Sequence, residues 1–186
     1  YLRAMSKFHN LRVVEIRRET VDSVSLLLES VSGETFHYKA GQYLTLRTTI
    51  DGEDVRRSYS LCSAPYEGVL RVAVKEVPDG KFSTYANRVL AVGDVLESML
   101  PDGRFTADTT SNEKNHLGFA AGSGITPIIS IIKEILHSSA ESRFALFYVN
   151  KETASIIFKD ELADLKDICL ERLQIFNLLP REPVEI

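Results

Sequence analysis

Four consecutive residues, Arg57-Ser58-Tyr59-Ser60, combine a fixed cation, an aromatic ring and two hydroxyls within one predicted strand. Side chains two positions apart on a strand point to the same face, so Arg57 and Tyr59 face one way and the two serines face the other. A flat ligand could stack on Tyr59 while its phosphates reach Arg57, and Ser60 could bond the edge of the ligand. The pattern suits a flavin nucleotide, although taken alone it also describes an ordinary strand with an exposed cation and a half-buried aromatic.

A second polar segment, residues 74–83, ends in a turn that could hold phosphate. Gly80 permits close approach of a ligand to the backbone, and the amides of Lys81, Phe82 and Ser83 would open a short helix whose N-terminal dipole suits a pyrophosphate. Ser83 adds a hydroxyl donor. Ordinary helix capping is the alternative interpretation of these residues.

The run Gly122-Ser123-Gly124-Ile125-Thr126-Pro127 lies between an apolar strand and an apolar helix. Two glycines in this context are typical of a dinucleotide-binding turn, although Pro127 stands where the third glycine is expected. Pro127 suits the first turn of a helix, and Thr126 presents a hydroxyl at the mouth of the turn. A purely structural turn between strand and helix is the alternative.

Asn150-Lys151 end the next predicted strand, at the carboxyl edge where nucleotides bind in parallel sheets. Lys151 could meet a phosphate of an adenosine group. A solvated loop lysine is the alternative.

Composition excludes several other classes of protein. The chain has 186 residues, 44% of them hydrophobic, and a formal net charge of -4, so it predicts a globular protein without a global basic field for nucleic acid or an anionic membrane. No apolar stretch approaches a membrane span of about 20 residues, and no signal peptide is evident, which predicts a cytoplasmic location. The isolated Cys62 and Cys169 indicate reduced core residues, and no metal site is predicted because the four histidines lack metal-ligand spacing.

Residues 5–108 are predicted to form a six-stranded antiparallel β-barrel that binds the flavin. Asp51-Gly52 predicts a tight hairpin between the third and fourth strands, and a short helix is expected over residues 82–90. The predicted strands cover residues 11–16, 23–28, 43–50, 55–61, 70–75 and 95–100.

Residues 114–186 are predicted to form a partial α/β nucleotide-binding domain with a parallel sheet, after a polar linker over residues 106–116. Apolar strands at 117–121, 144–149 and 173–179 alternate with helices, one of which carries isoleucines at helical spacing and the other covers residues 158–166. Such crossovers predict a sheet covered on both faces. Three strands make half of a doubly wound domain, so we expect the chain to be truncated at its C-terminus.

Together these segments resemble the ferredoxin-NADP reductase superfamily, and most closely the reductase components of multicomponent oxygenases of the phenylacetyl-CoA epoxidase type. The resemblance implies FAD as cofactor, NADPH or NADH as hydride donor, and a ferredoxin-type domain with a two-iron two-sulfur cluster in the missing C-terminal part. It also implies an oxygenase component as partner. The matching runs are residues 40–46, 57–60, 80–83, 121–127 and 155–158.

The resemblance also assigns roles to residues. Arg57 would neutralise the flavin pyrophosphate, and three residues would act in catalysis: Tyr59 by stacking on the isoalloxazine, Ser60 by bonding near its N5 edge, and Thr126 near the point of hydride transfer. The remaining cofactor-binding residues would be Ser58, Val74, Lys75, Gly80, Lys81, Phe82, Ser83, Gly122, Ser123, Gly124, Ile125, Pro127, Asn150 and Lys151.

Some functional alternatives stay open on the sequence. Pro180 stands where relatives often have a serine that binds the 2'-phosphate of NADPH, so the sequence does not decide between NADPH and NADH. The cations Lys151 and Arg181 slightly favour NADPH. The strand with a Cys-Gly-Pro-like motif facing the nicotinamide is missing, which leaves turnover by this chain open. A flavin-binding electron-relay module without pyridine-nucleotide chemistry is the alternative function, and a barrel and sheet without a cofactor is a third interpretation.

Overall fold

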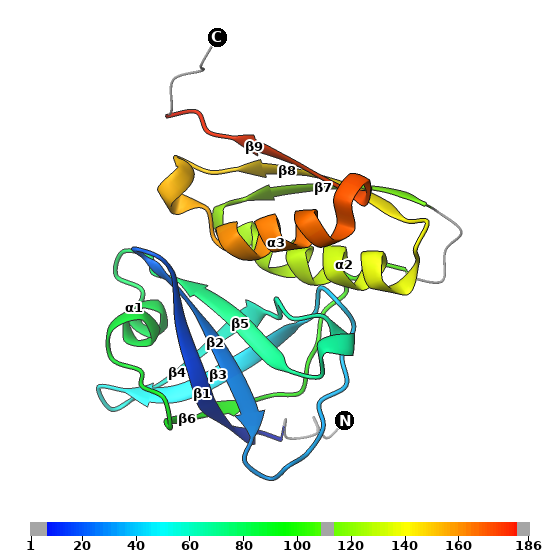
Figure 1. The fold of residues 1–186 in the computed structure, drawn as a ribbon. Helices are drawn as coiled ribbons and strands as arrows, with labels where there is room; N and C mark the ends of the chain where they lie inside the picture. Colours follow the sequence, from blue (N-terminus) through cyan, green and yellow to red (C-terminus); the bar gives the residue numbers. More distant parts are fainter. Residues whose placement is uncertain (1–6, 109–113, 182–186) are drawn as a thin grey trace.

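The first half of the chain is a six-stranded antiparallel sheet that curls into a barrel (Figure 1). The computed structural model describes residues 7–108 and 114–181. The strand order is β4-β3-β6-β1-β2-β5, and a bridge between Leu61 and Val72 joins the two edge strands at one end. The strands are β1 (His9–Thr20), β2 (Ser23–Ser30), β3 (Tyr43–Ile50), β4 (Glu53–Ser60), β5 (Leu70–Lys75) and β6 (Val95–Ser98).

Alternating apolar residues build the barrel core, as the sequence predicted. Leu44 and Leu46 of β3 and Val72 and Val74 of β5 are fully buried at every second position. The predicted hairpin between β3 and β4 is confirmed, with Asp51 at φ 50° and Gly52 at φ 78°. Both central residues of a tight hairpin turn need positive φ, which explains this dipeptide.

The short helix α1 (Lys81–Arg88) lies beside the barrel, between β5 and β6 in sequence (Figure 1). Arg18 of β1 donates hydrogen bonds to the side-chain and backbone oxygens of Asn87, at 2.9 Å and 2.8 Å. The amide of Asn87 in turn donates to the backbone oxygens of Val74 and Ser83, at 3.0 Å and 2.9 Å. These contacts fix the helix against both β1 and β5.

The second half is a three-stranded parallel sheet in the order β7-β8-β9. The strand predicted from residue 117 begins two residues earlier. Four single-turn 3-10 helices also occur among the described residues of the two halves: η1 (Pro65–Glu67), η2 (Gly122–Gly124), η3 (Thr153–Ser155) and η4 (Leu170–Arg172). The longer elements are β7 (Asn115–Ala121), α2 (Ile125–Ser138), β8 (Arg143–Val149), α3 (Lys159–Cys169) and β9 (Leu173–Leu178).

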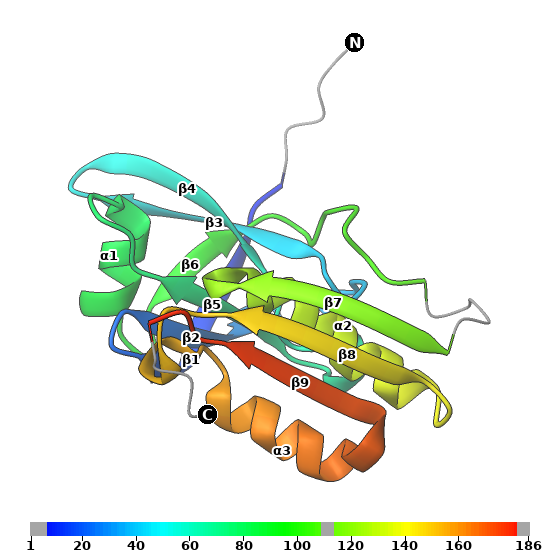
Figure 2. The ribbon, with the colours of Figure 1, turned by 90° about the horizontal axis from the view of Figure 1, so that it is seen from above.

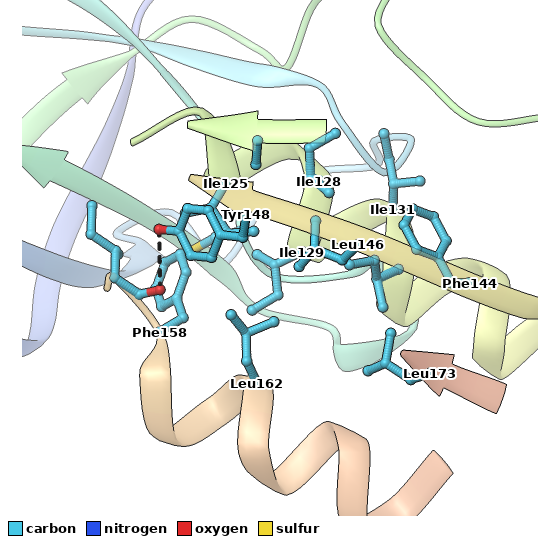
Figure 3. Packing of buried hydrophobic residues seen from close by; sticks show 14 of the residues in the cluster. Ile125, Ile128, Ile129, Ile131, Phe144, Leu146, Tyr148, Phe158, Leu162 and Leu173 are labelled. Carbon is cyan, nitrogen blue, oxygen red and sulfur yellow. Dashed lines mark hydrogen bonds between the residues drawn. The ribbon is translucent and has the colours of Figure 1, made fainter. Parts of the chain in front are cut away.

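Helices α2 and α3 both lie on the same face of this sheet, on the side of the barrel (Figures 1 and 2). The expectation of a sheet covered on both faces is therefore wrong for the described residues. Right-handed crossovers that always step in the same direction place their helices on one side, and only a reversal of strand order places a helix on the other. The buried face packs Ile129, Leu146 and Tyr148 against Leu162 (Figure 3).

The opposite face of the sheet carries a row of aromatic rings. Phe119, Phe147 and Phe176 stack across the three strands, with ring centroids 5.3 Å and 4.8 Å apart. No segment within residues 7–108 or 114–181 covers them, and Phe119 is 69% exposed.

The bounds predicted for the two halves, 5–108 and 114–186, reach into residues 5–6 and 182–186, which lie outside the described residues, as do linker residues 109–113. Cys62 and Cys169 are free and buried, as the sequence predicted. Among the described residues, no helix combines the length and apolar character that crossing a membrane requires.

Candidate functional site

A cavity of about 320 Å³ lies where the barrel meets the first turn of the α/β half. Its walls come from the edge strands β4 and β5, the start of α1, and the turn that leads into α2. This volume lies at the lower end of the range of small-molecule sites. The lining residues are Arg57, Ser58, Tyr59, Ser60, Ala73, Lys75, Val77, Gly80, Phe82, Ser83, Ser123 and Thr126.

Strand β4 presents Arg57 and Tyr59 on one side, as period-two alternation predicts. Arg57 is paired with Leu46 of β3, and Tyr59 with Leu44, so both share the side of the barrel core. Because β4 is an edge strand of the six-stranded sheet, a ligand can lie beside these side chains. Across the described residues Arg57 has no carboxylate partner, and its guanidinium donates to the backbone oxygen of Arg56 at 2.6 Å. The cation is therefore available to a ligand phosphate.

The phenol ring of Tyr59 packs beside Phe82 at the start of α1, with ring centroids 5.3 Å apart and a tilt of 39°. Burial raises the pKa of Tyr59 to about 12, partly offset by the nearby Arg57 charge. Tyr59 is thus neutral at physiological pH and offers an uncharged ring face for stacking.

The turn before α1 is shaped for a close backbone approach. A Cβ at Gly80 would lie 2.3 Å from Ser83 Oγ and 2.6 Å from Val77 Cγ2, so a larger residue would have to displace these two side chains. The Ser83 hydroxyl donates to the Gly80 carbonyl at 3.1 Å and accepts the Val77 amide at 3.3 Å. The first amides of a helix have no intrahelical acceptor, so those of Lys81 and Phe82 are available to an anion.

The α/β half contributes Ser123 and Thr126 to the same cavity. Residues 122–124 form a 3-10 turn that leads directly into α2, with Gly122 at φ 50°. The Thr126 hydroxyl donates to the Ser123 carbonyl at 3.0 Å and is nearly buried. Among the described residues no donor contacts this hydroxyl oxygen, so it can accept a hydrogen bond from a ligand.

A second cavity, of about 260 Å³, lies beside the first at the carboxyl edge of the parallel sheet. Asn150 is 5% exposed, and its buried amide atoms make no hydrogen bond of good geometry within the described part of the chain, although the amide lies near enough to the Tyr148 hydroxyl to partly offset the rise that burial causes in the pKa of Tyr148. A buried amide without a partner is costly, and a bound polar group would satisfy it. The lining residues are Lys75, Ala121, Gly122, Val149, Asn150, Lys151, Ser155, Pro180 and Arg181.

The structure does not bring every predicted residue to these cavities. The side chains of Val74 and Ile125 are fully buried in the two cores, because each follows the inward-facing phase of its own element. Lys81 turns towards Glu53, whose carboxylate its ammonium contacts at 2.5 Å. Gly124 and Pro127 line neither cavity. Any effect of these two residues on binding would therefore come through the shape of the turn and not through direct contact with a ligand.

Five lining residues were given no role in the sequence analysis: Ala73, Val77, Ala121, Val149 and Ser155. Ala73 lies on the same side of β5 as Lys75, and its small size leaves room in the first cavity. The alternation of β5 was a signal that could have identified it. Val77 lies in a loop and Ser155 in the single-turn helix η3, where no periodicity indicates which side chain faces a ligand.

Comparison with known proteins places both halves in oxidoreductase families. Residues 11–107 match the family described as "Oxidoreductase FAD-binding domain", and residues 119–185 match "Oxidoreductase NAD-binding domain". One subunit of 1,2-phenylacetyl-CoA epoxidase from Escherichia coli is 38% identical over 184 residues, which are 97% of this chain and 52% of that protein.

Two further relatives extend the comparison. The ferredoxin reductase component of 3-ketosteroid-9-alpha-monooxygenase from Rhodococcus rhodochrous is 36% identical over 91% of this chain and 48% of that protein. The solved structure of phthalate dioxygenase reductase superposes with a TM-score of 0.79 at 27% identity, covering 96% of this chain and 54% of that one. The chain thus spans about half the length of the curated relatives it matches.

The fold and the two family matches define an oxidoreductase that binds FAD and a nicotinamide nucleotide. The chain belongs to the ferredoxin-NADP reductase superfamily.

The stacking role of Tyr59 makes a prediction for the FAD-loaded chain. Tyr59→Ala should weaken FAD binding by roughly 0.5 to 1.5 kcal/mol beyond the loss of buried area, because the aromatic contact is removed. Bound-flavin fluorescence should rise, because a stacked phenol quenches it. Tyr59→Phe is the matched control, which should keep the affinity while raising the fluorescence. Fluorescence as low in the alanine variant as in the parent would disprove the stacking.

Proposed function

We propose that this chain transfers a hydride from NAD(P)H to FAD, and that the electrons then pass to an iron-sulfur centre and an oxygenase component. One observation supports this most strongly: a single cavity is lined both by Arg57 and Tyr59 of the barrel and by Ser123 and Thr126 of the α/β half. We also propose residues 5–108 and 114–186 as the bounds of the two domains.

The first cavity suits FAD in its chemistry. The Arg57 guanidinium and the amides at the start of α1 would bind the pyrophosphate, while the Tyr59 ring would hold the isoalloxazine face. Ser60, at the end of β4, would hydrogen-bond the ring edge nearest to Thr126. Bound there, FAD would supply the capacity to accept two electrons together and to release them singly.

The second cavity suits the adenosine end of the nicotinamide nucleotide. Lys151 and Arg181 line this cavity and have no carboxylate partner among the described residues, and Asn150 places its buried amide there. Two such cations favour a phosphate monoester, so NADPH is the donor that we propose. The turn at 122–127 would hold the pyrophosphate and place the nicotinamide next to Thr126.

The partners are proposed from the relatives alone. Those relatives are, by name, a subunit of an epoxidase and a reductase component of a monooxygenase. Phthalate dioxygenase reductase is described as a modular structure for electron transfer from pyridine nucleotides to a two-iron two-sulfur centre. We propose that this chain serves the same kind of electron transfer, with a ferredoxin-type domain and an oxygenase component as acceptors.

Titration of the purified chain with FAD tests the cofactor assignment. The protein should become yellow and bind FAD at one equivalent per chain, with quenched flavin fluorescence. A chain that stays colourless after incubation with excess FAD, while remaining folded by circular dichroism, would contradict the proposed function.

A further inference from the structure

One face of α2 contacts the barrel segment that follows β4, through hydrogen bonds, an ion pair and a ring stack. The Ser130 hydroxyl, fully buried, donates to the Ser63 carbonyl at 2.6 Å. One helical turn later the Lys133 ammonium contacts η1, and His137 stacks on Tyr66 with ring centroids 3.8 Å apart. Positions 130, 133 and 137 share one helix face, so these contacts form a continuous seam.

Lys133 is the charged centre of this seam. Its side chain is 5% exposed, and its ammonium lies 3.2 Å from both carboxylate oxygens of Glu67 and in contact with the carboxylate of Glu161 on α3. Burial lowers the pKa of Lys133, but the charges of Glu161 and Glu67 more than offset this, and the pKa is raised. Lys133 is therefore cationic at neutral pH and joins three elements of both halves of the chain.

The seam begins next to the first cavity. Ser63 follows Ser60 by three residues, and Ser130 follows Thr126 by four, while Ser60 and Thr126 both line that cavity. Lys133 lies about 10 Å along the helix axis from Thr126. Less than two turns of α2 therefore separate Lys133 from Thr126.

We infer that Lys133 is a positioning residue, which joins Glu67 of the barrel to Glu161 of α3 and thereby sets the distance between the end of β4 and the turn that carries Thr126. The inference rests on the proposed function, because this distance controls hydride transfer only if flavin and nicotinamide meet in that cavity. Hydride donor and acceptor must be held about 3 to 3.5 Å apart, and a displacement of about 1 Å can slow such a reaction about 100-fold.

The test compares Lys133→Met with Lys133→Arg in the FAD-loaded chain. We expect the rate of anaerobic flavin reduction at saturating NADPH to fall about 10- to 100-fold in the methionine variant. FAD affinity, NADPH affinity and the rate of reduction by dithionite should not change. The arginine variant should keep most of the parent rate because it can still pair with both carboxylates.

Two further variants accompany Lys133→Met: a matched control, and a replacement in case Lys133→Met does not fold. Lys114→Met removes an exposed lysine that pairs with Glu141 at 3.2 Å, away from the seam, and should keep the parent rate. Glu67 and Glu161 are partly exposed and can be hydrated, so Lys133→Met is expected to fold. If it does not fold, Glu67→Gln replaces it and should also slow reduction. Equal reduction rates in parent and variant would overturn the inference.

Hydrogen exchange separates this inference from the proposed function. If the parent binds FAD but NADPH does not reduce it, the proposed function fails, yet exchange of the amides in residues 122–127 still reports the position of the turn. Faster exchange of those amides in Lys133→Met than in Lys114→Met supports the role of Lys133. Unchanged exchange contradicts it.

Discussion

Replacing Arg57 by alanine should weaken FAD binding by about 1.5 to 3 kcal/mol, which is on the order of 10- to 100-fold in the dissociation constant. The reason is that the guanidinium has no carboxylate partner among the described residues and faces the cavity, so a pyrophosphate gains a charge-assisted contact there. Fluorescence titration with FAD measures the effect. The stability of the FAD-free chain should change little, because no structural ion pair is lost.

The neighbouring Arg56 provides the matched control. It points to the other face of β4, where it pairs with Asp54 at 2.8 Å, and it does not line the cavity. Arg56→Ala removes the same charge from the same strand and should leave FAD affinity close to that of the parent. Equal affinities in all three proteins would remove Arg57 from the site.

Replacing Gly41 by alanine should cost roughly 3 to 5 kcal/mol in the free energy of unfolding, the largest effect on stability that we expect. Gly41 has φ +95°, and a Cβ there would lie 2.0 Å from the Phe105 backbone oxygen and 3.0 Å from Ile131 of α2. A backbone oxygen cannot move away as a flexible side chain would. Denaturant unfolding followed by circular dichroism measures the loss.

A substitution at Gly33 distinguishes the cost of the steric clash at Gly41 from the cost of its backbone strain. Gly33 also has positive φ, +74°, but a Cβ there meets nothing within 4 Å. Gly33→Ala should therefore cost only about 1 kcal/mol, the strain of a left-handed backbone alone. Similar losses in the two variants would show that the close approach of residue 105 to Gly41 does not exist in solution.

Much of the fold could be predicted from local patterns. Alternation located the barrel strands, and Asp51-Gly52 identified the β3–β4 hairpin because few dipeptides accept positive φ at both positions. Strand β1 is longer than predicted, reaching from His9 to Thr20, because pairing with β2 extends it through a charged segment. Local patterns also could not predict that α2 and α3 share a face, since this depends on the direction of strand order.

Part of the candidate site could likewise be predicted from the sequence, and part of it could not. The shared orientation of Arg57 and Tyr59 follows from the period of a strand, so the sequence could predict it. The seam around Lys133 could not be predicted, because Glu67 and Glu161 are distant in sequence and meet Lys133 only through tertiary packing. On the sequence alone, a lysine among isoleucines gives no sign of which carboxylates lie beside it.

Anaerobic titration of the FAD-loaded chain with NADPH tests most directly whether flavin and nicotinamide meet in the cavity between Tyr59 and Thr126. We predict that the two flavin absorption bands bleach on addition of NADPH, and that NADH at the same concentration reduces the flavin more slowly because it lacks the phosphate that Lys151 and Arg181 would bind. Flavin bands that remain unchanged with excess NADPH and NADH, but that disappear with dithionite, would contradict the proposed meeting of the two cofactors.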